Sequence, residues 1–288
     1  FPAGSPQRQL LGINLPRDAG TPVWMSDDGP MYAQREDTGE PVSAERGAAT
    51  GADPSGTHHM RRVTSFRSRR STLSGGQQET WERLWPRLGT EARDADGRPT
   101  VLDSAAWFGR HAPLILEIGC GTGTSTAAMA LQEPDFDVIA VEVYKKGLGQ
   151  LLGALDRDGI TNVRLVRGDG VDVLEHSLAT ASLTGVRVFF PDPWPKARHH
   201  KRRLLQPATM ALIADRLVPG GILHAATDHM GYAEHIAEVG DAEPRLRRVR
   251  PSFDGSDDLP ISVARPETKY ERKALAGPVV TELLWERI

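Results

Sequence analysis

Cysteine is almost absent from this sequence: among 288 residues the single thiol is that of Cys120. One cysteine excludes a disulfide within the chain and a zinc site built from several cysteines. No apolar run is long enough to span a bilayer, and the first residues lack the charged and then apolar pattern of a signal sequence. The sequence begins with Phe1 rather than Met, so we expect its natural start to lie upstream or to have been processed. These features favour a protein of the reducing cytoplasm, with no membrane partner and no bound metal.

Neither sign of charge is in clear excess, because 35 basic and 38 acidic residues leave a formal net charge of −3. The distribution is uneven, since residues 1–60 carry four Arg, no Lys and eight acids, whereas residues 61–73 carry five Arg and no acid. Residues 1–60 are rich in Gly, Pro, Ser and Thr, and they can bury too little apolar area to offset the entropy lost on ordering. The composition predicts a disordered acidic tail over 1–60 and one domain over 61–288.

From Ser74 onward, apolar segments of strand length alternate with segments of helical periodicity. Strands are predicted at 112–119, 136–143, 163–169, 185–190, 222–227 and 277–288. Helices are predicted at 124–132, 145–159 and 207–221, and another helix from Ser74 is expected to stop near Pro86. This alternation is typical of βαβ units, in which helices cover both faces of a mostly parallel sheet. The predicted fold class is therefore α/β, with a doubly wound, Rossmann-like sheet.

A glycine turn, defined here as residues 119–123 in the order Gly-Cys-Gly-Thr-Gly, joins the strand at 112–119 to the helix that follows it. Glycines let a backbone turn tightly and approach a ligand closely at a helix N-terminus. Glu142 ends the next strand, nineteen residues past Gly123, where a carboxylate can accept hydrogen bonds from ribose hydroxyls. The alternative is that the turn serves packing only.

The ligand of this turn would be a dinucleotide or S-adenosylmethionine. Glu117 stands two residues before Gly119, where a carboxylate would repel a pyrophosphate but suits a ligand with an ammonium and a sulfonium group. Asp169 ends the third strand, where it can bind an adenine amino group. The three acids favour S-adenosylmethionine, and the predicted cofactor residues are Glu117, Gly119, Gly121, Gly123, Glu142 and Asp169. The alternative is that each acid is a solvated loop residue.

Residues 188–203, VFFPDPWPKARHHKRR, change character twice. An apolar strand ends at a Pro-Asp-Pro-Trp-Pro sequence, which places Asp192 at the same sheet edge as the three acids, between two prolines that fix its backbone. Trp194 offers a flat face on which a base can stack. The next residues, called the basic run below, suit a phosphate backbone: Lys196, Arg198, His199, His200, Lys201, Arg202 and Arg203. A solvated helix face is the alternative interpretation.

With these motifs the sequence resembles the tRNA (guanine-N7-)-methyltransferases over about residues 61–288. The resemblance is carried by the segments RRVTSF, LEIGCGTG, VIAVEV, FFPDPWPKARHHKRRL, HAATDHMGYAEH and RPETKYE, with ELLWER near the end. It implies a class I methyltransferase that transfers a methyl group from S-adenosylmethionine to N7 of guanine 46 in the variable loop of tRNA. We expect the enzyme to work as a monomer or as a homodimer.

The resemblance also implies roles for individual residues. Glu117, Glu142 and Asp169 would bind S-adenosylmethionine, while Asp192 would be catalytic and would border the cofactor. Substrate contacts would come from Lys196, Asp228, Thr268, Lys269, Tyr270 and Glu271, and RNA contacts from Arg198, His199, His200, Lys201, Arg202 and Arg203. N7 of guanine carries a free lone pair, so no proton has to leave before it attacks the methyl group. We therefore expect Asp192 to act by orientation and electrostatics.

Three other functions stay open on the sequence. A methyltransferase for small molecules or proteins would share only the cofactor half, and it would leave both basic clusters unexplained. An RNA-binding module without catalysis would have no use for the acids. A nicotinamide dehydrogenase conflicts with the position of Glu117.

Overall fold

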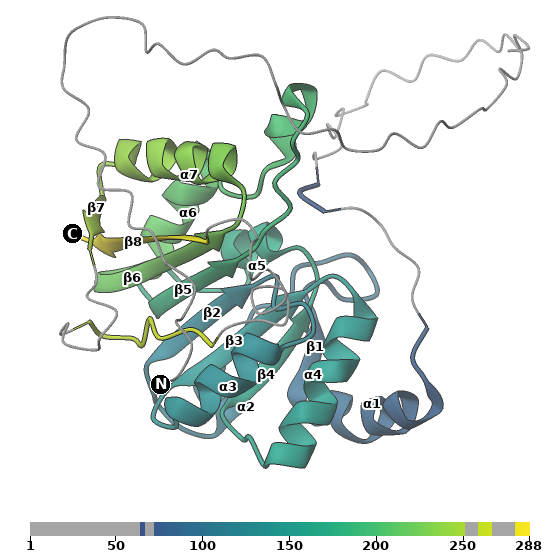
Figure 1. The fold of residues 1–288 in the computed structure, drawn as a ribbon. Helices are drawn as coiled ribbons and strands as arrows, with labels where there is room; N and C mark the ends of the chain where they lie inside the picture. Colours follow the sequence, from purple (N-terminus) through teal and green to yellow (C-terminus); the bar gives the residue numbers. More distant parts are fainter. Residues whose placement is uncertain (1–63, 67–71, 251–258, 267–279) are drawn as a thin grey trace, which may run out of the picture. The chain divides into compact units, whose positions relative to one another are not determined.

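The structure is a computed structural model that describes residues 64–66, 72–250, 259–266 and 280–288. The predicted disordered tail over 1–60 lies outside these residues, as does the predicted substrate segment with Thr268, Lys269, Tyr270 and Glu271. Both therefore stay predictions. Within the described ranges, helices and strands alternate along the chain (Figure 1).

The described strands form one eight-stranded sheet in the order β1-β4-β3-β2-β5-β6-β8-β7. Their bounds are β1 Gly89–Glu91, β2 Leu114–Ile118, β3 Asp137–Glu142, β4 Val163–Arg167, β5 Leu183–Phe189, β6 Leu217–Thr227, β7 Leu246–Val249 and β8 Thr281–Arg287. Strands β1 to β6 pair in parallel, and β8 runs antiparallel to both β6 and β7. The predicted α/β fold with a mostly parallel sheet is confirmed.

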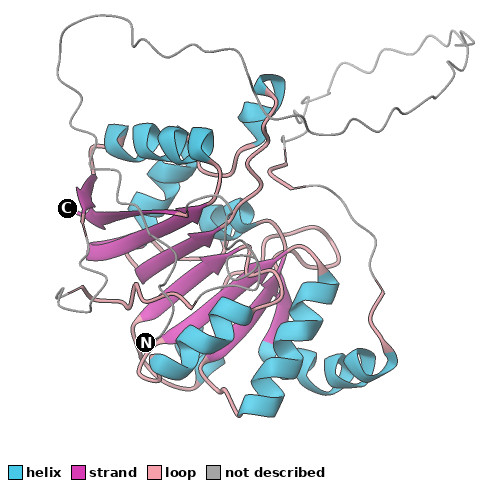
Figure 2. Ribbon diagram, in the orientation of Figure 1, coloured by secondary structure: helices cyan, strands magenta, loops and turns pink. Residues whose placement is uncertain are grey.

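Helices cover both faces of the sheet, as Figure 2 shows. On one face, α1 (Gly75–Leu88), α3 (Thr124–Gln132) and α4 (Lys145–Asp158) share a core with alternate strand residues such as Ile115 and Val138. On the other face, α2 (Ser104–Phe108), α5 (Gly170–His176), α6 (Pro207–Arg216) and α7 (Met230–Ala242) pack on Leu116 and Ile139. Successive side chains along each strand point to opposite faces, so every strand contributes residues to both cores, as expected for a sheet buried on two sides.

Two helix ends differ from their predicted positions. Helix α1 continues two residues past Pro86, to Leu88, because Trp81, Leu84 and Leu88 bury one face of the helix and Trp81 stacks on Trp85 at 4.0 Å. This packing outweighs the single hydrogen bond that proline removes near the C-terminus. Helix α6 ends at Arg216 rather than at residue 221, since residues 217–221 already belong to β6.

The order of the strands locates the ligand edge of the sheet. The chain proceeds from β2 to β3 and β4 in one direction, and β5 and β6 then lie on the other side of β2. In such open sheets the crevice beyond the carboxyl ends of the two central strands, here β2 and β5, is where ligands bind. Within the described residues, no helix is long and apolar enough to cross a membrane.

Candidate functional site

The glycine turn follows β2 and leads into α3 at the predicted ligand edge. Gly119 and Gly121 have φ of 78° and 57°, a conformation that residues with a side chain rarely adopt. A Cβ placed on either glycine would meet no atom within 4 Å, so the turn borders open space. The N–H groups of Gly119 and Cys120 both donate to the carbonyl of Val141, which holds the turn against β3.

Glu142, the last residue of β3, holds the same turn through its carboxylate. One oxygen accepts the Gly121 N–H at 3.0 Å, and the other accepts the N–H groups of Val143 and Tyr144 at 2.7 and 3.0 Å. A carboxylate offers about four acceptor positions, so these three bonds leave about one for a ligand hydroxyl. Glu142 therefore shapes the turn in addition to being available to a ribose.

Gly147 is a site residue that the sequence analysis missed. It lies in the first turn of α4, where a Cβ would approach the carbonyl oxygen of Gly121 to 2.2 Å. Only glycine lets the helix pack this closely on the glycine turn. The signal available in the sequence was the Lys-Lys-Gly-Leu-Gly start of the helix, but no spacing rule ties it to the turn.

Glu117 lies on the same face of β2 as Ile115, the face covered by α1, α3 and α4, and it is 3% exposed. Its Oε2 atom has no hydrogen-bond partner within the described residues. Burial raises the pKa of Glu117, and the nearby guanidinium of Arg187 opposes this shift. Arg187 is the residue opposite Glu117 on β5, and its Nη2 atom is hydrogen-bonded to Glu133 rather than to Glu117. A buried carboxylate oxygen without a partner is costly, so this atom is suited to a cationic ligand group.

Asp169 follows β4 and forms the N-cap of α5, where its side chain accepts the Val171 N–H at 3.0 Å. The structure thus places Asp169, Glu142 and Glu117 at or beside the carboxyl ends of β4, β3 and β2, which are neighbours in the sheet. These three strand ends were predicted from the alternation of strand-like and helical segments alone. Their acids and the open glycine turn fit a ligand with a ribose and an ammonium group.

Asp192 lies at the carboxyl end of β5, next to β2 in the sheet, in a turn with unusual backbone geometry. Phe190 and Trp194, which flank Pro191-Asp192-Pro193, have φ of 51° and 45°. The Asp192 side chain is exposed. The turn therefore presents an exposed carboxylate on a constrained backbone, at the end of the strand next to the one that leads into the glycine turn.

The basic run forms a 3₁₀-helix, η1 (Ala197–Arg202), with Lys196 and Arg203 at its two ends. Lys196, Arg198 and Lys201 are exposed, and the two histidines are half-buried. Arg203 is 5% exposed and donates to the carbonyls of Pro193 and Gly231 at 2.9 and 3.1 Å. The run is thus divided between side chains directed to solvent and side chains that fix the loop.

The ring of Trp194 was predicted to be available for stacking on a base. It is buried instead, because the residue is only 4% exposed. Its Nε1 atom donates to the carbonyl of Ser65 at 2.9 Å, and the Arg202 guanidinium lies over its ring. Arg202 in turn donates to the carbonyls of Thr64 and Phe66, both at 3.1 Å. Trp194 is therefore a buried contact between the Asp192 turn and residues 64–66.

Asp228 is exposed and directly follows β6, at the same sheet edge as Asp192. The predicted substrate residue thus lies one strand further along, since β5 and β6 are parallel neighbours. Within the part of the chain that the structure describes, no three His, Cys, Asp or Glu side chains are grouped to hold a metal ion.

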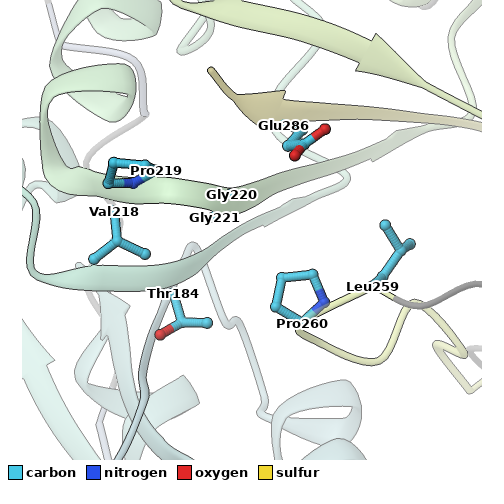
Figure 3. A pocket seen from close by; sticks show the side chains of 8 residues that line it. All are labelled: Thr184, Val218, Pro219, Gly220, Gly221, Leu259, Pro260 and Glu286. Carbon is cyan, nitrogen blue, oxygen red and sulfur yellow. The ribbon is translucent and has the colours of Figure 1, made fainter.

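A pocket of about 400 Å³ lies at the other end of these strands (Figure 3). It is lined by Thr184 at the start of β5, residues 218–221 at the start of β6, Leu259, Pro260 and Glu286. Because β5 and β6 are parallel, this end is opposite the edge that carries Asp192 and Asp228. None of the predicted site residues lines this pocket.

Comparison with known proteins first defines the class. A family model described as "Putative methyltransferase" matches residues 111–279, which is more than half of the chain. The matched span contains the glycine turn, Glu142, Asp169 and Asp192, and the class that it defines is that of the methyltransferases.

The relatives define the family. The tRNA (guanine-N(7)-)-methyltransferase of Mycolicibacterium gilvum (strain PYR-GCK) is 69% identical over 268 residues, which are 91% of this chain and 99% of that protein. The protein of the same name from Mycobacterium tuberculosis (strain ATCC 25177 / H37Ra) is 61% identical over 267 residues, which are 91% of this chain and 96% of that protein. The chain belongs to the tRNA (guanine-N7-)-methyltransferase family. Among solved structures, the 16S rRNA methyltransferase KamB is more distant, with 16% identity and a TM-score of 0.46 over 68% of this chain and 98% of that one.

Proposed function

We propose that the protein transfers a methyl group from S-adenosylmethionine to N7 of guanine 46 in the variable loop of tRNA. The names of its relatives support the tRNA substrate and the N7 atom. The motif resemblance supports position 46. The observation that carries the proposal is the exposed carboxylate of Asp192 on a constrained turn, which follows the strand next to β2 and directly precedes η1 in the chain.

Glu117, Glu142, Asp169 and the glycine turn would hold the cofactor. The unpartnered Oε2 of Glu117 would accept the ammonium group, and the remaining acceptor position of Glu142 would take a ribose hydroxyl. Asp169 would bind the adenine amino group. When bound, S-adenosylmethionine supplies a methyl group on a positively charged sulfur.

Asp192 would orient the guanine and stabilise the charge that develops on it. N7 attacks with a free lone pair, so the base becomes cationic without losing a proton. A carboxylate can accept hydrogen bonds from the N1 and N2 protons of guanine, which fixes the base edge. The same carboxylate attracts the developing positive charge, and this stabilisation needs no rearrangement because the turn is already fixed. Alignment of nucleophile, methyl group and leaving sulfur supplies the rest of the rate enhancement.

The exposed side chains around this turn would hold the tRNA. Lys196, Arg198 and Lys201 would contact phosphates, together with His199 and His200. Arg202 and Arg203 would act through the loop that they fix, since their guanidinium groups already bind backbone carbonyls. Asp228 and the segment from Thr268 to Glu271 would complete the substrate site. We propose a cytoplasmic enzyme that works as a monomer or a homodimer.

The test is to incubate the protein with unmodified tRNA and S-adenosylmethionine labelled in the methyl group. N7-specific chain cleavage then maps the label, which we expect at guanine 46. A matched transcript with adenine at position 46 should take up no label. Label at another guanine would overturn the position, and label on the base at an atom other than N7 would overturn the chemistry.

A further inference from the structure

The turn that carries Asp192 starts from an unfavourable backbone conformation. Phe190, two residues before Asp192, has φ of 51°, which bulky residues rarely adopt. Its N–H donates to the carbonyl of Ala226 on β6 at 2.8 Å. A residue keeps such a conformation only where its surroundings determine it. The groups packed against Phe190 therefore decide the direction in which the chain leaves β5 toward Asp192.

A buried arginine is one of these groups. The side chain of Arg265 is 0% exposed, and its guanidinium carbon lies 4.8 Å from the centre of the Phe190 ring and 5.7 Å from that of Phe189. Attraction between a cation and an aromatic ring is strongest when both are removed from water. Arg265 thus holds the two aromatic residues that end β5 and begin the turn.

The charge of Arg265 is balanced on the last strand of the sheet. Its Nη2 atom donates to one oxygen of Glu282 on β8 at 3.2 Å, and the other Glu282 oxygen lies 2.7 Å from Nε2 of His224 on β6. Burial lowers the pKa of His224, which favours the neutral ring with Nε2–H donating to the carboxylate. His224 also meets the Phe189 ring edge-on, with centroids 4.9 Å apart. Arg265, Glu282 and His224 therefore surround the aromatic pair from three segments of the chain.

Stability alone is a weak reason for this arrangement. Replacing a buried ion pair by apolar residues of similar volume is often neutral or stabilising, because two charges have to be taken out of water. An apolar pair would fill the space but would exert no directional pull on the Phe190 ring. The charged arrangement is thus suited to fixing one conformation of the turn.

We propose that Arg265 is a positioning residue for methyl transfer: through the Phe190 ring and the Glu282 carboxylate it fixes the turn that aims Asp192 at the guanine. The inference rests on the proposed function, in which Asp192 faces the substrate. The predicted cofactor acids lie on β2, β3 and β4 or just beyond them, whereas Arg265 contacts the end of β5. Its loss should therefore slow methyl transfer and spare cofactor binding.

The experiment uses the double variant Arg265→Met with Glu282→Gln, which removes both charges and keeps an acceptor for His224. We expect single-turnover methylation with saturating tRNA and cofactor to slow by about ten- to a hundredfold, the range for a displaced reactive group. Affinity for S-adenosylmethionine, measured by calorimetry, should change less than about twofold, and the melting temperature should stay close to that of the wild type. Hydrogen exchange at the Phe190 amide should become faster. A folded double variant with the wild-type rate would overturn the proposal.

Two further variants keep the test decisive. Arg164→Met is the matched control. Arg164 is a buried arginine near the start of β4, away from the Asp192 turn, and its guanidinium lies over the ring of Phe108 in α2. It should lower stability without slowing methylation, and an equal rate loss in this control would assign the effect to general destabilisation and overturn the proposal. Phe190→Leu removes only the ring; if the double variant does not fold, a wild-type rate in Phe190→Leu overturns the proposal and a slowed rate supports it.

Failure of the inference is distinguishable from failure of the proposed function. Asp192→Asn is measured beside the other variants for this purpose. A slow Asp192→Asn together with a fast, folded double variant removes Arg265 from the mechanism and leaves the proposed role of Asp192 intact. A fast Asp192→Asn removes Asp192 from the site, and the inference fails with it.

Discussion

The guanidinium carbon of Arg202 lies 3.9 Å from the centre of the Trp194 ring, and both side chains also bind the backbone of residues 64–66. The stacked pair therefore connects the turn after β5 to a segment more than a hundred residues earlier in the chain. Because the Nε and Nη2 atoms of this guanidinium donate to two carbonyls, we expect Arg202 to contribute more to the position of the loop than to phosphate binding. This relationship divides the basic run into two groups with different expected effects on tRNA binding.

Arg198 and Lys201 should contribute to tRNA binding as charges. Both are exposed, so replacing both with Ala should flatten the plot of log affinity against log salt by about 0.7–0.9 per lost phosphate contact. Filter binding over a range of salt concentrations measures this slope. Arg203→Ala is the contrasting variant, and it should lower the melting temperature because the carbonyls of Pro193 and Gly231 lose the donor that ties them together. An unchanged slope in Arg198→Ala/Lys201→Ala would make η1 a solvated surface only.

Asp192→Asn should reduce the rate of methyl transfer by about a hundred- to a thousandfold, as the loss of a preorganised group that stabilises transition-state charge does. The substitution keeps the size, removes the charge and directs an amide donor at guanine protons, which are donors themselves. Single-turnover methylation with saturating tRNA measures the rate. Asp135→Asn changes an exposed acid in the loop after α3; it is the control and should behave as wild type. A near wild-type rate in Asp192→Asn would move the search to Asp228 and Glu271.

Glu142→Ala should weaken S-adenosylmethionine binding in two ways. It removes a ribose acceptor, and it leaves the N–H groups of Gly121, Val143 and Tyr144 without their partner. Each such loss is worth about 0.5–1.5 kcal/mol, so we expect affinity to fall by at least tenfold. Calorimetry measures the affinity, with Glu82→Ala on the exposed face of α1 as the control. Unchanged affinity in a folded Glu142→Ala would remove this residue from the cofactor site.

Glu117→Gln should stabilise the free protein and weaken cofactor binding. Burial raises the pKa of Glu117, so the folded state binds its proton more tightly than the unfolded state does. The free energy of unfolding of the wild-type protein therefore falls as pH rises from the pKa of this group in the unfolded state, about 4.3, through its pKa in the folded state. Gln does not titrate, so the gain in the free energy of unfolding over wild type should be larger at pH 8 than at pH 5. Urea unfolding at several pH values measures it, and a gain that shrinks with pH would contradict the assignment.

The sequence predicted the parts of the fold that depend on local pattern. Strands β2, β3 and β4 and helices α3 and α4 follow runs of apolar residues with clear periods, and the acids at the three strand ends follow from those runs. The short elements β1, α2 and β7 were missed, since three to five residues carry no period, and the helices α5 and α7 were also not predicted. Their formation depends on neighbours distant in the chain, such as Leu165 and Val166 beside β1.

The site was predictable as a set of residue types but not as a set of contacts. The order of residues does not indicate that Arg202 and Arg203 turn inward while Arg198 and Lys201 stay exposed. The difference arises because Arg202 and Arg203 bind backbone carbonyls of residues 64, 66, 193 and 231, which are distant in the chain or on another turn. Gly147 and Arg265 were missed for the same reason. Their roles depend on distances to Gly121 and Phe190, which only the assembled fold defines.

The position of β8 has a consequence for how the chain is made. This strand is the last in the sequence, yet it lies between β6 and β7, and β7 has no other strand partner among the described residues. On the ribosome, β6 and β7 are therefore synthesised while the place between them is still empty, with the pairing edge of β6 exposed. An unpaired edge invites association with other chains. We infer that this half of the sheet closes only after translation has delivered Trp285, whose buried ring then packs against Gly240 of α7.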